Sequence, residues 1–140
     1  MVFFENEAAI LHVYPEQNLA ATIWKGFASS SVLREILDKV KQMYAQYPIH
    51  YSISDNRKLK VIRPADMEYI NNEWLPEVLS TAQLKKSATI ESEDIFGKIS
   101  TDNILRAADK YITFDIAFFE SLEEASKWLG VQINQEDLAA

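Results

Sequence analysis

The sequence predicts a single α/β domain over residues 1–140, built on one mixed, mostly parallel β-sheet of about five strands with about four helices. Three observations carry this prediction. A chain of 140 residues that is 48% hydrophobic is long and apolar enough to bury one core. Two strand-like runs separated by a short polar turn open the chain and indicate an N-terminal β-hairpin. Helical and strand-like patterns then alternate, which favours parallel strands joined by helical crossovers.

The hairpin is predicted from two apolar runs. "AAILHVYP" reads as a strand that stops at Pro15, and "LAATIWKG" reads as its partner. Residues 1–8 precede the pair as an N-terminal arm. Apolar residues then recur at helical spacing between Ser31 and Tyr47, and Pro48 ends that helix.

A third strand, "IHYSIS", is followed by a helix that Pro64 opens, with Asp66 in its first turn. Pro76 lies inside the apolar stripe of this helix and is expected to kink or split it. "LKKSATIE" then predicts a strand, "STDNILRAADKY" a short helix, and "ITFDIAFF" the last strand.

The last helix has the clearest boundaries. Ser121 and Glu124 have the spacing of a capping box, and Gly130 is placed to end the helix. The remaining residues, 131–140, are expected to be a frayed tail.

Charge and composition exclude several classes of protein. Fourteen basic against 21 acidic residues give a net charge of −7, which argues against a nucleic-acid or anionic-membrane binder. The absence of cysteine excludes disulfides and thiolate chemistry. No run is apolar enough to cross a bilayer, and the acidic start "MVFFENEAAI" is unlike a signal peptide. We therefore expect a cytoplasmic protein.

The order of elements, with three short motifs, resembles the STAS domain, named for sulphate transporters and anti-sigma-factor antagonists. The motifs are "WKG" at residues 24–26, the Asp55 and Arg57 pair after the middle strand, and "EEASKWL" near the end. The chain most resembles small free-standing bacterial proteins with that fold and no assigned activity. The resemblance implies a regulatory or protein-binding module.

The resemblance does not extend to the phosphoswitch of the switching members. In those proteins an aspartate is followed by a phosphorylatable serine, one variable residue, a glycine and an apolar residue. Here the stretch is "DNRKL", so Asn56 stands in place of the serine and Lys58 in place of the glycine. Asparagine has no hydroxyl to phosphorylate.

Four consecutive polar residues, Ser54, Asp55, Asn56 and Arg57, form a candidate loop site after the middle strand. One interpretation is a strand end, in which Asp and Asn bond their own backbone and Arg57 pairs with Asp55. The other is a ligand site, since open α/β sheets bind ligands at the carboxyl ends of their strands.

Alternation along the strands predicts one bulky sheet face and one small face that bears hydroxyls. Residues assigned to the small face form a candidate pocket face: Ser52, Ser87, Thr89, Thr113 and Asp115. Small residues there allow close packing of a helix, with the hydroxyls bonded to backbone. Alternatively, they line a cavity for a small, partly polar or apolar ligand.

Two aromatic residues near the start suggest an interface. Phe3 and Phe4 precede the first predicted strand, where a small monomer would expose them. Because the first strand is also a candidate sheet edge, we expect a homodimer through this segment.

A catalytic or metal-binding constellation is not visible. His12 and His50 lie on different predicted strands without neighbouring carboxylates, and no phosphate-binding loop or nucleophile motif occurs. The acidic "ESED" cluster lacks the pattern of a calcium loop. The sequence predicts no cofactor and favours a non-catalytic interaction or regulatory module. A carrier or sensor of a small molecule comes second, because the CRAL-TRIO lipid-transfer fold resembles STAS-type sheets, and an enzyme comes third.

Overall fold

A computed structural model describes residues 1–134 and 136, and over these residues the sheet has six strands in chain order. The first three pair antiparallel, and the remaining pairs are parallel. This confirms the predicted α/β class with its N-terminal hairpin. The strands are β1 (Val2–Glu5), β2 (Ala9–Tyr14), β3 (Leu19–Trp24), β4 (Tyr51–Asp55), β5 (Lys86–Ile90) and β6 (Asp115–Phe119).

The segment predicted as an N-terminal arm contains strand β1, so that part of the prediction is wrong. β1 pairs with β2, and the register shifts between Val2 and Phe4. The short polar run between the two strands makes a tight turn in which Asn6 accepts hydrogen bonds from the backbone of Ala8 and Ala9. Asn6 thereby fulfils the turn role that a short polar side chain allows.

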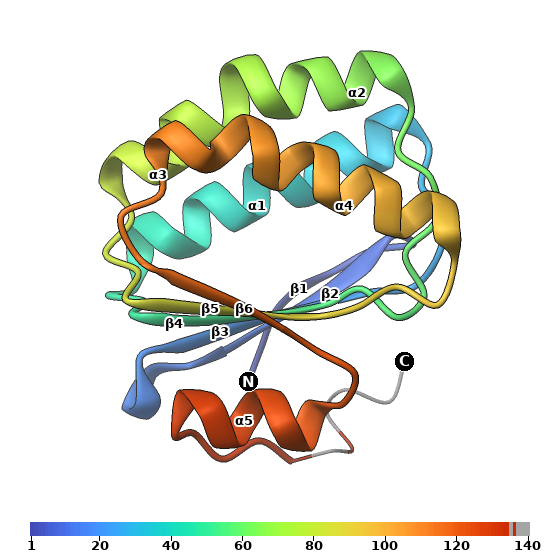
Figure 1. The fold of residues 1–140 in the computed structure, drawn as a ribbon. Helices are drawn as coiled ribbons and strands as arrows, with labels where there is room; N and C mark the ends of the chain where they lie inside the picture. The colour runs from blue at the N-terminus through green and yellow to red at the C-terminus, as the bar shows by residue number, and fades with distance from the viewer. Residues whose placement is uncertain (135, 137–140) are drawn as a thin grey trace.

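Helices cover both faces of the sheet, as Figure 1 shows. α1 (Ser30–Gln46), α2 (Pro64–Tyr69), α3 (Leu75–Thr81) and α4 (Ile95–Ala108) lie on one face, and α5 (Leu122–Leu129) lies on the other. Three single turns complete the order: η1 (Pro15–Gln17), η2 (Ile70–Trp74) and η3 (Asp109–Tyr111).

Pro76 divides the second predicted helix, as expected from its missing N–H. The turn before it, η2, is wound as a π-helix between α2 and α3. The N–H of Leu75 donates to the carbonyl of Ile70, five residues back, so the chain remains helical while its register shifts. The split places the side chains of η2 and α3 over the sheet.

The face under α5 is densely packed. The helix has its capping box, in which the Ser121 hydroxyl accepts from Glu124 N at 3.2 Å, and Gly130 ends it with φ +73°. The chain then folds back, and the partly buried Val131 and Ile133 pack on the same core. Residues 131–134 are therefore not frayed; the prediction for 135 and 137–140 lies outside the described residues.

The helices of the other face pack largely against one another. Among the residues that the structure describes, one buried cluster holds α1, η2, α3 and α4 together, and it consists of Leu33, Leu37, Ile70, Leu75 and Ala108. A second cluster joins α1 to β2, where Leu11 and Val13 meet Ile36 and Met43. Neither contains a buried residue from β4 or β5, so the helices are held above the central strands rather than pressed onto them.

Candidate functional site: a cavity above the central strands

A cavity of about 230 Å³ lies between the sheet and the helices α1, α3 and α4. Its floor comes from β3, β4, β5 and the segment around β6, and its walls and roof come from the helices. At this volume the space exceeds the needs of a single water molecule several-fold. The site is thus a built hollow in the core rather than a packing defect the size of a methyl group.

The floor carries the hydroxyl groups that alternation predicts. Ser52 and Ser54 of β4 lie beside Ser87 and Thr89 of β5 in parallel register, and all four line the cavity. Thr22 of β3 extends the row that holds Ser54 and Thr89. The prediction that these hydroxyls share one face is confirmed.

The prediction for β6 is wrong by one residue. Ser87 pairs with Ile116 and Lys86 with Asp115, so the cavity face of β6 carries Ile116. Thr113 and Asp115 are exposed and do not line the cavity. Alternation separates an apolar parity from a half-polar one in "ITFDIAFF", but it does not say which of the two shares a face with the hydroxyls of β5.

Hydroxyls at one end of the floor bond to each other rather than to backbone. The Ser52 hydroxyl donates to the Ser87 hydroxyl at 2.8 Å, and the Tyr44 phenol of α1 shares a hydrogen bond with Ser52. Burial raises the pKa of Tyr44 to about 12, although the Ser52 hydrogen bond acts in the opposite direction. Tyr44 is therefore a neutral group at physiological pH.

The four polar residues at 54–57 divide between two environments. Ser54 donates to Asn56 Oδ1 at 2.6 Å, and Asn56 Nδ2 donates to Thr101 Oγ1 of α4 at 3.1 Å. These three residues line the cavity. Asp55 instead accepts two hydrogen bonds from the guanidinium of Arg57, at 2.9 and 2.6 Å, and these bonds raise the pKa of Arg57. Strand-end pairing accounts for Asp55 and Arg57, and the cavity accounts for Ser54 and Asn56.

The helix predicted to begin at Pro64 does begin there. After Asn56 the chain runs without helix until Pro64, so Asn56 does not occupy a helix N-terminus. Its backbone N–H donates to Ile90 O and its carbonyl accepts from Leu59 N. Asn56 is a buried turn residue whose side chain closes one end of the cavity.

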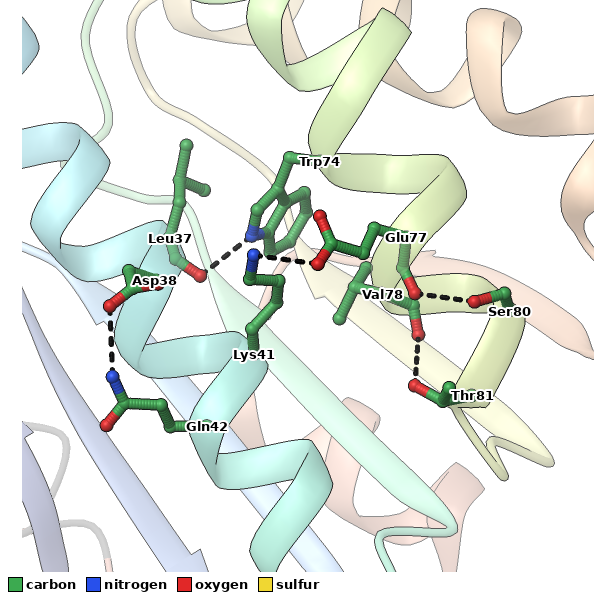
Figure 2. A network of polar contacts seen from close by, with 9 residues as sticks. All are labelled: Leu37, Asp38, Lys41, Gln42, Trp74, Glu77, Val78, Ser80 and Thr81. Atoms are coloured by element: carbon green, nitrogen blue, oxygen red, sulfur yellow. Dashed lines mark hydrogen bonds and ion pairs between the residues drawn. The ribbon is translucent and has the colours of Figure 1, made fainter.

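The wall between α1 and α3 is held by the contacts drawn in Figure 2. Trp74 lines the cavity and its indole N–H donates to the Leu37 carbonyl at 2.7 Å. Outside it, Lys41 Nζ lies 3.1 Å from Glu77 Oε1, and this contact raises the pKa of Lys41. The first contact satisfies a buried indole N–H, which a tryptophan in an apolar wall requires.

The helix-borne members of the site were missed by sequence reasoning. Tyr44, Ile70, Trp74 and Thr101 sit on apolar stripes that read as ordinary core. The available signal was indirect: a helix that covers a hydroxyl-bearing strand face needs polar side chains of its own. Tyr44 and Thr101 are polar residues within such stripes.

Phe3 and Phe4 are not exposed, so the reason given for an interface at these side chains is wrong. Both are partly buried and pack on the cluster between α1 and β2. The Phe3 ring meets Tyr47 edge-on at 6.2 Å, and Lys39 Nζ lies 5.1 Å from the Phe4 ring centre. Their apolar character serves the core of the monomer.

The described lining of the cavity is uncharged. The lining side chains among the described residues include no lysine, arginine, histidine or carboxylate. Over the same part of the chain, no group of three or more histidine and acidic side chains is placed to hold a metal ion. No helix in the described ranges combines the length and apolar character needed to cross a membrane.

The chain matches no protein-family model, and a comparison with curated proteins gives no significant match.

Proposed function

We propose that this protein is a non-catalytic carrier or sensor that binds one small, largely apolar molecule in the cavity above β4 and β5. The observation that carries the proposal is the pairing of a hollow of about 230 Å³ with a hydroxyl floor on inner strands of the sheet. A chain selected only for stability would fill this space, because cavities cost free energy in proportion to their volume.

Size sets the range of ligands. An apolar cavity of about 150 Å³ accommodates benzene, so by proportion this cavity suits a compound of roughly nine non-hydrogen atoms. Most of the lining is aliphatic or aromatic, contributed for example by Leu37, Val78, Leu105 and Ile116. Such walls supply affinity, and the few polar groups supply orientation.

The test is thermal unfolding in the presence of cumene, an apolar compound of this size. A ligand that binds only the folded state raises the unfolding temperature as its concentration rises. Ala108→Leu adds a side chain to the lining and should remove this effect. The matched control is Ala107→Leu, one residue earlier on α4 and outside the lining. An equal shift in both variants, or none in the wild type, would refute the proposal.

We further propose a relationship to STAS-like proteins of the free-standing bacterial type. The order of a hairpin followed by alternating helices and parallel strands supports it. In that setting the bound molecule would regulate a partner, and the protein would act in the cytoplasm. We do not propose a serine phosphoswitch, because Asn56 stands where the switching proteins carry their phosphorylatable serine.

A regulatory module that binds protein is the second candidate, with another copy of this chain as the partner. The outer edge of β1 is unpaired in the described chain, and edges with free backbone groups invite pairing. The contact would be made by backbone, since Phe3 and Phe4 face the monomer core. A native mass spectrum that contains only monomer at micromolar concentration would contradict a homodimer.

A further inference from the structure

The polar groups on the floor of the cavity carry more hydroxyl and amide hydrogens than they use in hydrogen bonds to one another. Tyr44, Ser52 and Ser87 carry three hydroxyl hydrogens and share two hydrogen bonds, so one hydrogen is left over. Asn56 has two amide hydrogens and donates one, to Thr101. The backbone of β4 and β5 is occupied by the sheet ladders on either side of each strand.

Thr89 is the clearest unmet donor. Its side chain lines the cavity and the residue is only 6% exposed. Within the described residues its hydroxyl makes no hydrogen bond, and it is not one of the fully enclosed polar atoms that lack a partner, so it opens onto the cavity. A hydroxyl that faces an apolar hollow without a protein partner is free to donate its hydrogen to a bound molecule. Thr89 lies beside Ser54 in register, near the end of the cavity that Asn56 closes.

Charge excludes two classes of ligand from this position. Among the residues that the structure describes, no cationic or anionic side chain lines the cavity, and the one titratable group there, Tyr44, stays neutral because burial raises its pKa to about 12. A carboxylate or ammonium group would lose its hydration without gaining an ion pair, which is strongly unfavourable. The lining thus selects against charged ligands of the right size.

We propose that the ligand is a neutral, compact, mostly apolar compound with a single acceptor oxygen, such as a ketone or aldehyde, and that Thr89 donates its hydroxyl hydrogen to that oxygen. This proposal rests on the proposed function, since it names the class of molecule that the same cavity takes. The apolar part lies against the helices, and the oxygen lies at the end of the floor marked by Thr89 and Asn56.

Four compounds of closely matched size test the proposal by isothermal titration: acetophenone, cumene, benzoate and 1-phenylethylammonium. We expect acetophenone to bind roughly five- to tenfold more tightly than cumene, the factor that one neutral hydrogen bond supplies. Benzoate and 1-phenylethylammonium should bind at least roughly tenfold more weakly than cumene.

Substitution of Thr89 locates the donor. Thr89→Val should abolish the advantage of acetophenone over cumene, and Thr89→Ser should retain it. Thr113→Val makes the same chemical change at an exposed residue outside the lining and should alter neither affinity. Cumene binding by Thr89→Val also shows that this variant folds and keeps its cavity.

The outcomes separate the two proposals. Equal binding of acetophenone and cumene, tightest binding of benzoate, or an acetophenone advantage that survives Thr89→Val would overturn the neutral-acceptor proposal and leave a binding cavity. Failure of all four compounds to bind would overturn the proposed function together with it.

Discussion

Individual residues set the polarity of the cavity. Serine and threonine on inner parallel strands are unusual, since such strands are commonly apolar on both faces. Here Ser52 and Ser87 bond to each other, and Tyr44 reaches Ser52 from α1. Their hydrogen bonds keep the floor polar without placing a charge inside the protein.

Tyr44 makes the stability of the protein depend on pH in alkaline solution. In the unfolded chain its phenol loses a proton near pH 10, whereas the folded protein retains that proton up to about pH 12. The free energy of unfolding therefore falls between these values, by about 2–3 kcal/mol in total, and is unaffected by this group below pH 10. Urea unfolding of the wild type and Tyr44→Phe at pH 9 and pH 11.5 measures the difference.

The substitution isolates one group because all other tyrosines and lysines are shared by the two proteins. We expect the wild type to lose more stability than Tyr44→Phe over this interval. Tyr51→Phe, on the opposite sheet face, serves as the control and should behave like the wild type. Parallel loss in the wild type and Tyr44→Phe would show that the Tyr44 phenol is as accessible as in the unfolded chain.

For individual residues, the sequence predicted some positions on the cavity face correctly and others wrongly. Alternation placed Ser52, Ser54, Ser87 and Thr89 correctly because hydrophobic and polar residues differ clearly in β4 and β5. It failed for Thr113 and Asp115 because β6 is an edge strand, and an exposed edge tolerates polar and apolar residues on either face. The donor role of Thr89 could not be predicted, because the sequence does not show whether its hydroxyl has a hydrogen-bond partner in the folded protein.

Among the elements, helix α4 packs unusually closely against the loop that follows β4, and the contact lies in the first turn of the helix. A Cβ on Gly97 would overlap the Leu59 carbonyl and would lie 2.6 Å from Ser92 Oγ. That hydroxyl itself donates to the Leu59 carbonyl at 2.9 Å, so the neighbours are fixed. Glycine here lets the helix roof approach the loop that follows β4.

Gly97→Ala should therefore destabilise the protein although alanine is the better helix former. Helix propensity favours alanine by about 1 kcal/mol, whereas overpacking against backbone costs about 1–3 kcal/mol. Because the clash involves a carbonyl that cannot rotate away, we expect the upper part of that range to prevail. Ile99→Ala, at a half-exposed position on the same helix, should change the free energy of unfolding by less than about 1 kcal/mol. A Gly97→Ala protein as stable as the wild type would contradict this account of how α4 is seated.

The α1–α3 wall combines a strong and a weak contact. Trp74→Phe removes the indole hydrogen bond to Leu37 and part of the buried ring, and should lower the free energy of unfolding by about 2 kcal/mol. Lys41→Ala removes an ion pair whose Glu77 partner is 64% exposed, and should cost about 0.5 kcal/mol or less. Urea unfolding compares the two; a larger loss for Lys41→Ala would reverse this ranking.

Most elements could be predicted because their signals are local. Pro76, Gly130 and the Ser121 capping box act on their own helices, and each has the predicted effect. Strand β1 was missed because it is a short apolar run, Val2 to Phe4, that ends at Glu5 and shows no alternation. Its pairing with β2 depends on tertiary packing of Phe3 and Phe4 over α1, which local patterns do not contain.

For the whole molecule, the order of the sheet explains why a cavity exists. Strands β3 to β6 follow each other in sequence, and the helices that connect them all lie on one face. These helices share their own buried cluster, so they form a layer that spans the central strands (Figure 1). α5 packs directly on the opposite face, where its buried residues and those of β3, β4 and β5 form one continuous cluster. One face of the sheet is thus covered by a packed core, and the other face borders the cavity.

The most direct test of the central claim is native mass spectrometry of the protein purified gently from its host, before and after addition of acetophenone. We expect a reproducible extra mass, on the order of 100–200 Da from a ligand of roughly nine non-hydrogen atoms, on the wild type and none on Ala108→Leu. A wild-type protein that carries no extra mass when isolated and acquires none with acetophenone would contradict it.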